Sequence, residues 1–368
     1  MRIGVPKEIK RHEYRVGMTP ASVKAYVKSG HEVIVEKGAG VGSGYDDSEY
    51  EVNGARLTAD KAELFRQSEM IVKVKEPLAE EYPLFHEGQI LYTYLHLAAC
   101  KELARELIQR KVAGVAYETI ELPDRSLPCL TPMSEIAGRL AIQEGAKYLE
   151  KAFGGRGILL GGVPGVQRGK VAILGGGVVG TNACKIAVGI GANVTILDIN
   201  AKRLAYLDDI FGSSITTLYA TEANIEYVLR ESDIVVGAVL VAGETAPRLI
   251  TRQHLSLMQP GAVIVDVAID QGGCAETSKP TTHDDPIYIV DGIVHYCVAN
   301  MPGAVARSST IALTSVTLQY GLQIASQGLK EAARANEAIR KGINTINGTC
   351  VHPGVAKSCG LPYTEYRA

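Results

Sequence analysis

The chain has 368 residues, of which 46% are hydrophobic and 21% are charged, and its formal net charge is −2. This length predicts two domains rather than one, with the composition of an ordinary soluble globular protein. A net charge near zero offers no electrostatic attraction for nucleic acid or an anionic membrane surface, so we expect neither as a partner.

Targeting signals, membrane spans and metal motifs are not expected either. The opening segment MRIGVPKEIK has no apolar core of a signal peptide, and no run of about 18 apolar residues could span a bilayer. There are seven cysteines, and no two are separated by only two or three residues. This spacing argues against a zinc site and against a disulfide framework, and it favours the reducing cytoplasm.

The first third of the chain alternates short β-branched segments with helical patterns. We expect strands over residues 2–6, 32–36, 70–74, 89–95 and 112–118. Helices are expected over 19–30, with Thr19 as N-cap, and over 100–111. This β-α-β order predicts a mostly parallel sheet covered by helices.

The same order begins again near residue 170 and predicts a second parallel sheet, extending to about residue 298. Its strands are expected over 170–174, 193–197, 233–241, 262–268 and 287–292, with a helix over 251–258. The fold class predicted is therefore α/β, with two doubly wound Rossmann-like domains.

Long helical segments over 133–151 and 308–328 flank this middle block, and the tail over 329–348 is also helical in pattern. The tail is too short for a third domain, so we expect it to pack onto the first sheet. The first domain would then be discontinuous, formed by 1–129 and 307–368, with the second domain over 130–306 inserted in it and joined by the long helices.

The segment ILGGGVVG contains the spacing G-x-G-x-x-G as Gly175, Gly177 and Gly180, between an expected strand and an expected helix. Gly175 allows a tight turn, Gly177 lets backbone amides approach a pyrophosphate, and Gly180 lets the helix pack close to the strand. The next strand ends at Asp198, which can bind ribose hydroxyls and would repel a 2′-phosphate. NAD is therefore favoured over NADP, although Arg203 nearby weakens that preference. Alternatively, Asp198 caps the following helix.

Ligands of open α/β sheets bind outside the carboxyl ends of the strands. In the first domain two expected strands end at Lys75 and His96, and Arg15 lies in the long loop after the first strand. In the second domain Asp270 follows the strand over 262–268. We expect these four side chains to meet in the crevice between the sheets.

Each of the four also has a plainer interpretation. His96 could be a packed core histidine, and Asp270 a turn residue. Arg15 and Lys75 could be solvated surface charges. For each residue taken alone, the sequence is therefore compatible with a functional role and with a purely structural one.

The chemistry of the four groups favours a joint role. Arg15 offers a planar fork that suits a carboxylate, and Lys75 can polarise a keto oxygen. Histidine has an ordinary pKa of about 6.5, which suits His96 to proton exchange near neutrality. Asp270 can orient water, ammonia or a substrate hydroxyl. With a nicotinamide, this set predicts hydride exchange at the α-carbon of a small 2-oxo or 2-amino acid.

At these residues the sequence closely resembles the L-alanine dehydrogenase family, to which the N-terminal part of proton-translocating nicotinamide transhydrogenase is related. The resemblance covers essentially the whole chain. It runs through the segments MRIGVPKEIK, HEYRVGMTP, VKVKEP, YLHLA, TPMSEIAGR, GVPGV, GGGVVG, VDVAIDQGGC and VANMPGAV.

The resemblance implies a cytoplasmic homohexamer that catalyses the reversible, NAD-dependent conversion of L-alanine to pyruvate and ammonia. It implies that His96 and Asp270 are the catalytic pair and that Arg15 and Lys75 bind substrate. Further NAD contacts are implied at Ser134, Val178, Asp198, Arg203, Val239, Leu240, Val267, Ala268, Ile269, Asp270, Lys279, Val298, Ala299, Asn300 and Met301. Ala220 stands where the family usually has a serine, and Lys279 where it usually has an arginine.

Two rival functions remain open from the sequence. One is a dehydrogenase of the same fold that acts on another amino or oxo acid, such as glyoxylate or a lysine-derived substrate. The other is a non-catalytic NAD-binding sensor, against which the joint presence of Arg15, Lys75, His96 and Asp270 argues.

Overall fold

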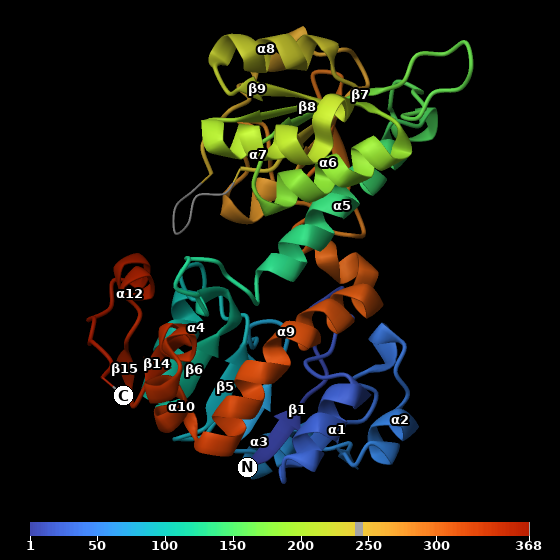
Figure 1. The fold of residues 1–368 in the computed structure, drawn as a ribbon. Coiled ribbons are helices and arrows are strands. Elements are labelled where there is room, and N and C mark those ends of the chain that lie inside the picture. Colours follow the sequence, from blue (N-terminus) through green and yellow to red (C-terminus); the bar gives the residue numbers. More distant parts are fainter. Residues whose placement is uncertain (240–245, 368) are drawn as a thin grey trace. The chain divides into compact units, whose positions relative to one another are not determined.

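The computed structural model describes residues 1–239 and 246–367 and divides the chain into two compact units (Figure 1). The first unit comprises Met1–Met133 and Gly303–Ala368, and the second comprises Ser134–Pro302. The first unit is therefore built from both ends of the chain, and the second from one continuous segment.

The first unit contains an eight-stranded sheet in the order β15-β14-β6-β5-β4-β1-β2-β3. Its strands are β1 (Arg2–Val5), β2 (Glu32–Glu36), β3 (Arg56–Thr58), β4 (Met70–Val72), β5 (Ile90–Thr93), β6 (Ala113–Ala116), β14 (Ile343–Ile346) and β15 (Thr349–Cys350). Strands β1 to β6 pair in parallel, whereas β14 pairs antiparallel with β6 and with β15. The C-terminal segment thus extends the sheet that the first residues begin.

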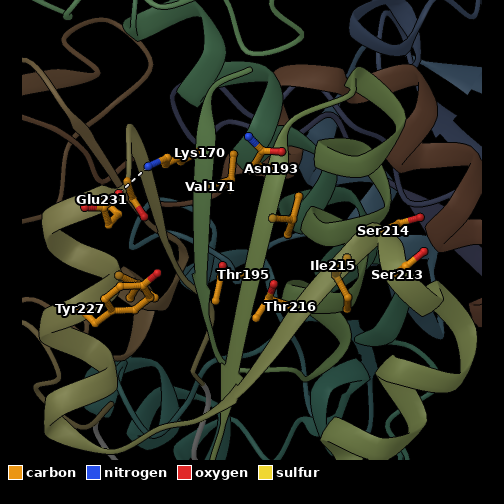
Figure 2. Close-up of a pocket in the computed structure, with 13 residues that line it drawn as sticks. Lys170, Val171, Asn193, Thr195, Ser213, Ser214, Ile215, Thr216, Tyr227 and Glu231 are labelled. Atoms are coloured by element: carbon orange, nitrogen blue, oxygen red, sulfur yellow. Dashed lines mark hydrogen bonds and ion pairs between the residues drawn. The ribbon is translucent and has the colours of Figure 1, made fainter. Parts of the chain in front are cut away.

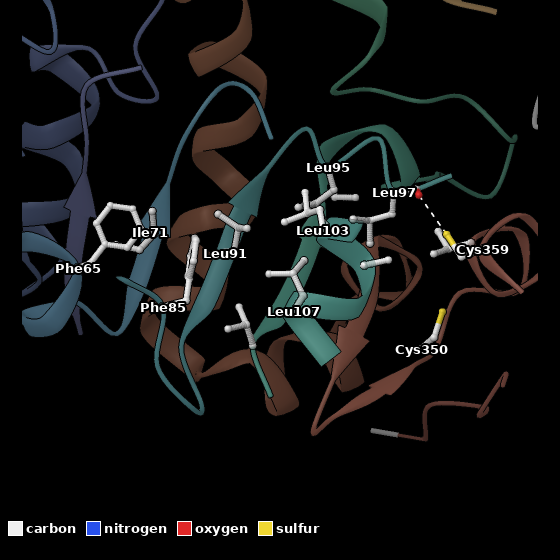
Figure 3. Close-up of a cluster of buried hydrophobic side chains, with 14 of the residues drawn as sticks. Phe65, Ile71, Phe85, Leu91, Leu95, Leu97, Leu103, Leu107, Cys350 and Cys359 are labelled. Carbon is white, nitrogen blue, oxygen red and sulfur yellow. Dashed lines mark hydrogen bonds between the residues drawn. The ribbon is translucent and has the colours of Figure 1, made fainter. Parts of the chain in front are cut away.

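Helices cover both faces of this sheet because side chains alternate along each strand. Its helices are α1 (Pro20–Lys28), α2 (Asp47–Val52), α3 (Lys61–Gln67), α4 (Lys101–Gln109), α9 (Ala306–Gln327), α10 (Leu329–Ala335), α11 (Glu337–Gly342) and α12 (Pro353–Cys359). Leu91 of β5 packs with apolar residues of α3, α4 and α12 (Figure 3). The next residue, Tyr92, faces the other way and donates a hydrogen bond to the carbonyl of Thr317 in α9 at 2.9 Å.

The second unit contains a seven-stranded sheet in the order β12-β13-β11-β10-β7-β8-β9. Its strands are β7 (Lys170–Leu174), β8 (Asn193–Asp198), β9 (Ile215–Tyr219), β10 (Ile234–Gly237), β11 (Val263–Asp266), β12 (Ile287–Val290) and β13 (Ile293–Tyr296). Its helices are α5 (Thr131–Tyr148), which begins in the first unit, α6 (Val178–Ile190), α7 (Ala201–Phe211) and α8 (Glu222–Glu231). Buried residues of α8 pack on β7 and β10, while α6 and α7 lie along a face of the sheet in Figure 1. The predicted class of two doubly wound α/β units is therefore confirmed.

Two predictions of local structure are wrong. The tail was expected to be helical to residue 348, but β14 replaces the helix from Ile343. Its isoleucine and threonine side chains suit a strand, the edge of β6 supplies its partner, and Asn347 and Gly348 turn the chain with positive φ angles of 50° and 75°. Strand β12 was expected in a parallel sheet, but it pairs antiparallel with β13.

Several strand ends also differ from expectation. Strand β4 ends at Val72 and β5 at Thr93, so Lys75 and His96 lie in the loops that follow these strands. The helix expected over 251–258 is a short 3-10 helix, Gln253–Leu257. The functional candidates nevertheless remain on the carboxyl side of their strands.

Candidate active site

The glycine turn joins β7 to α6 at the carboxyl end of the second sheet. Gly175 has φ +105°, a conformation that other residues rarely adopt. A Cβ atom at Gly180 would lie 1.8 Å from the carbonyl oxygen of Gly175. At Gly177, the N-cap of α6, a Cβ would meet no heavy atom of the described residues within 4 Å. The turn is thus tight on its inner side and open beside the helix N-terminus.

Asp198 and Arg203 both hold this turn. The Asp198 carboxylate accepts hydrogen bonds from the amide of Gly176 at 2.7 Å and from the amide of Asn200 at 2.8 Å. Arg203 donates to the Gly176 carbonyl and to the Thr181 hydroxyl. The N-cap of α7 is Asn200, whose side chain accepts from the amide of Arg203, so Asp198 is not the helix cap.

Most of the other implied NAD contacts follow neighbouring strands of the same sheet. They are Val239 after β10, Val267–Asp270 after β11, and Val298–Met301 after β13. Ala220 follows β9, and its amide donates to the carbonyl of Asp198. Leu240 lies outside the described residues. Ser134 lies on α5, and Lys279 lies over the ring of Tyr288 with Nζ 4.5 Å from the centroid.

Asp266, which was not among the residues predicted from the sequence, organises the turn that carries Asp270. The turn is a short 3-10 helix, Val267–Gln271. The buried carboxylate of Asp266 accepts from the amides of Ala268 at 3.1 Å, Cys274 at 2.8 Å and Ala275 at 3.2 Å. The only sequence signal was its place as the last residue of a buried strand. The side chain of Asp270 itself is exposed.

In the first unit, Arg15 is buried rather than solvated. Its Nε and Nη2 atoms donate to the Glu13 carboxylate at 2.7 and 2.6 Å, and its Nη1 lies 3.1 Å from the sulfur of Met133. Burial alone would lower the pKa of Arg15, but the hydrogen bonds and charge of Glu13 raise it. Glu13 therefore balances the buried charge of the guanidinium and sets its orientation.

Lys75 lies in the loop after β4, where neighbouring groups hold its backbone. Its amide donates to Glu8 Oε1 at 3.3 Å, and its carbonyl accepts from the Thr93 hydroxyl at 3.2 Å. Glu8 also accepts from the amide of Val74 at 2.7 Å. Glu8 in turn lies 3.1 Å from the ammonium of the fully buried Lys73. The Lys75 side chain is half-buried.

His96 does not have the surroundings of a packed core histidine, because 39% of its side chain is exposed. Its Nδ1 lies 3.0 Å from Glu76 Oε2, and its ring is stacked on Tyr94 with the centroids 5.8 Å apart. Burial would raise the pKa of Glu76, but the hydrogen bonds from His96 and Lys10, with the charges of His96 and Lys75, hold it well below its ordinary value.

A concavity of the second unit lies away from these residues. It has a volume of ≈ 350 Å³ and is lined by residues such as Lys170, Asn193 and Ile215, which begin β7, β8 and β9 (Figure 2). It therefore occupies the amino edge of the second sheet, whereas the glycine turn lies at the carboxyl edge. None of the predicted site residues lines it.

Comparisons with known proteins cover both units. Residues 4–137 match the N-terminal domain model of alanine dehydrogenase/PNT, and residues 141–353 match the C-terminal domain model. An alanine dehydrogenase of Methanococcus maripaludis is 59% identical over 365 residues, covering 99% of this chain and 98% of the relative. An alanine dehydrogenase of Geobacillus stearothermophilus is 56% identical over 369 residues, with the same coverage.

Two solved structures are also similar. An L-alanine dehydrogenase has 53% sequence identity and a TM-score of 0.95, covering 97% of this chain and 99% of that chain. A transhydrogenase from Sinorhizobium meliloti has 25% identity and a TM-score of 0.82, covering 96% and 99%. Within the part of the chain that the structure describes, no helix is long and apolar enough to cross a membrane. The chain belongs to the alanine dehydrogenase/PNT family.

Proposed function

We propose that the protein is an NAD-dependent L-alanine dehydrogenase, which interconverts L-alanine with pyruvate and ammonia. The observation that carries this proposal is full-length similarity to enzymes named alanine dehydrogenase, at 54–59% identity over 98% of their length. We assign substrate binding to the unit of Met1–Met133 and Gly303–Ala368, and cofactor binding to the unit of Ser134–Pro302.

The residues of the second unit fit NAD. The open space at Gly177 leaves room for a pyrophosphate beside the N-terminus of α6, where the helix dipole and the free amides favour an anion. The negative charge of Asp198 suits the ribose hydroxyls and opposes the 2′-phosphate of NADP. When bound, NAD would accept a hydride from the α-carbon of the substrate.

The residues of the first unit fit a small amino acid. Arg15, oriented by Glu13, and Lys75 hold the alanine carboxylate. Loss of hydride from the α-carbon leaves iminopyruvate, whose C=N carbon is open to attack by water. Asp270 aligns that water, and neutral His96 removes its proton as the C–O bond forms. The imidazolium then returns the proton to the amino nitrogen, the carbinolamine hydroxyl loses its own proton, and the C–N bond breaks to give pyruvate and ammonia.

The oligomer and compartment proposed are those of the family, a homohexamer in the cytoplasm. All seven cysteines are described and none is in a disulfide, in keeping with a reducing compartment. Light scattering of the purified protein tests the hexamer, and a mass of one, two or four chains would reject it.

Absorbance at 340 nm with NAD tests the proposed activity. Alanine, serine, glycine and lysine are supplied in turn, and the fastest NADH formation is expected with alanine. No signal with any of them would favour an NAD-binding sensor instead. Replacing His96 with Ala should abolish turnover while NADH still binds, and near-normal turnover in His96→Ala would remove His96 from the mechanism.

A further inference from the structure

Two glutamates from different segments converge on His96, and neither was identified from the sequence. Glu76 follows Lys75 in the loop after β4, and Glu118 lies in the short 3-10 helix Tyr117–Thr119 after β6. Because β4 and β6 flank β5 on either side, each loop reaches the turn that carries His96 from its own side. Glu76 contacts the imidazole, whereas Glu118 contacts the backbone.

Glu118 holds the backbone of the turn in an unusual conformation. His96 has φ +48°, in the left-handed region that residues with a Cβ rarely adopt. Glu118 Oε1 accepts from the amide of His96 at 2.6 Å, and both carboxylate oxygens accept from the amide of Leu95, at 3.1 and 3.2 Å. One carboxylate thus provides the acceptor for two successive amides at the strained position.

Glu76 determines which nitrogen of the ring carries the proton. A carboxylate can only accept a hydrogen bond, so its contact at 3.0 Å places the proton on Nδ1 of His96. Nε2 is then the nitrogen that exchanges a proton with a reacting molecule. The second oxygen of Glu76 accepts from the ammonium of Lys10, which prevents the carboxylate from turning away.

We propose that Glu76 and Glu118 are positioning residues of His96 with separate tasks: Glu76 selects Nε2 as the proton-exchanging atom and supports the imidazolium, and Glu118 aims the ring. The kinetic part of this proposal rests on the proposed function, since it needs a reaction in which His96 exchanges a proton. The tautomer part concerns the free protein alone.

The charges around His96 predict opposite effects for two substitutions. Glu76 contacts its Nδ1, Glu118 accepts from its amide, the Tyr94 ring is stacked on it, and Lys10 contacts Glu76. The charge of Lys75 acts on Glu76, and the amide of Cys100 donates to the carbonyl of His96. Glu76 places a negative charge at Nδ1 of His96, and Glu76→Gln removes that charge. Lys10 offsets part of that charge, and Lys10→Gln removes the offset.

The pH dependence of kcat/KM for alanine tests the role of Glu76. Deamination needs a neutral imidazole that can accept a proton, so its rate is expected to rise with pH. In Glu76→Gln this rise should move down by about 1 pH unit, and in Lys10→Gln it should move up. Pyruvate amination needs a protonated imidazole, so its rate falls at high pH. This fall should move in the same direction as the rise of the deamination rate. A Glu76→Gln profile that coincides with wild type, or moves upward, overturns the role.

The split between kcat and KM tests Glu118. Glu118→Ala should lower kcat by about 10²-fold at every pH, without moving the pH profile and with little change in KM, because the base is intact but wrongly aimed. Glu118→Gln keeps the shape and one acceptor oxygen and should recover part of the loss. Glu121→Gln, three residues along the same segment at a partly exposed ion pair with Lys341, is the matched control. Unchanged kcat in a folded Glu118→Ala variant overturns this role.

A measurement without substrate separates this inference from the proposed function. In protein labelled with ¹⁵N-histidine, the ring nitrogens of His96 are identified by their loss in His96→Gln. Wild type above neutral pH should show the proton on Nδ1, and Glu76→Ala should shift it partly to Nε2. A wild-type proton on Nε2 overturns the Glu76 role even if alanine is oxidised, whereas failure to oxidise alanine would reject only the proposed function.

Discussion

Gly180 lies so close to Gly175 that a Cβ atom on Gly180 would be 1.8 Å from the Gly175 carbonyl oxygen. No side chain can be admitted there without moving α6 away from the end of β7. The contact is between backbone atoms, so it cannot be relieved by a rotamer change. The position of the helix N-terminus relative to the glycine turn therefore depends on this one missing side chain.

Gly180→Ala should weaken NADH binding at least about 10-fold, equivalent to about 1.4 kcal/mol, because the helix N-terminus must shift. The measurement is a fluorescence titration with NADH, together with the melting temperature. Gly189→Ala is the control: it lies on the same helix, where a Cβ would meet no described heavy atom within 4 Å. That substitution should leave NADH binding unchanged and raise helix stability by up to about 1 kcal/mol. Equal affinities in the two variants would contradict the role of the contact.

Asp198→Asn should reduce the preference for NAD over NADP by about 10-fold in the ratio of their kcat/KM values. The amide removes the negative charge that repels a 2′-phosphate but can still accept one of the two backbone hydrogen bonds that Asp198 now accepts. Asp208→Asn, an exposed carboxylate on α7, is the control. An unchanged ratio in Asp198→Asn would mean that the preference has another source.

Lys73→Met should destabilise the protein by about 3–5 kcal/mol, because it removes the buried cation that two buried carboxylates share. Lys73 is fully buried, with Nζ 3.0 Å from Glu81 and 3.1 Å from Glu8. Urea unfolding measures the loss. Lys341→Met, at the partly exposed pair with Glu121, should cost less than about 1 kcal/mol. An equal loss of free energy of unfolding in the two variants would show that burial of the ion pairs of Lys73 does not determine their contribution to stability.

His295 should make the protein less stable in mild acid. It is fully buried on β13, its Nδ1 lies 3.0 Å from the carbonyl of Ile293, and its Nε2 lies 2.8 Å from the Thr277 hydroxyl. Burial lowers the pKa of His295, so the unfolded state binds more protons below about pH 6.5. The stability it provides is therefore present above that pH and is lost as the pH falls.

The measurement is the apparent melting temperature between pH 5 and 7.5, compared with His295→Gln. The wild-type melting temperature should fall more steeply below pH 6.5, because the free energy of unfolding falls by up to about 1.4 kcal/mol per pH unit for the one proton. Parallel curves for the two proteins would exclude His295 as the cause, because all other titrating groups are shared.

The β-α-β order, the glycine turn and the approximate strand ends were predictable because short stretches of neighbouring residues determine them. Alternation and glycine spacing depend on local backbone geometry, so β7, α6 and β8 appear where the pattern puts them. The strand β14 was missed because its partner, β6, lies more than 200 residues away in the sequence. The helical pattern of the tail is local, so it could not indicate that the distant edge of β6 would pair with this segment as a strand.

The groups that hold the site residues were unpredictable for a related reason. His96 could be chosen as a histidine beyond a buried strand, but its two glutamates lie 20 and 22 residues away. Glu76 and Glu118 look like any other charged residues of a loop. Only the order β4-β5-β6 in the sheet makes them neighbours of one imidazole.

The extension of the first sheet by β14 has a consequence for the order of events during synthesis. The second unit is one uninterrupted segment, Ser134–Pro302, so all of it is translated before the last strands of the first unit. Until residues 343–346 are available, the edge of β6 (Ala113–Ala116) has no strand to pair with, although its residues are buried in the folded unit. The nascent first unit must therefore be protected from pairing with other chains until β14 has been made and has paired with β6.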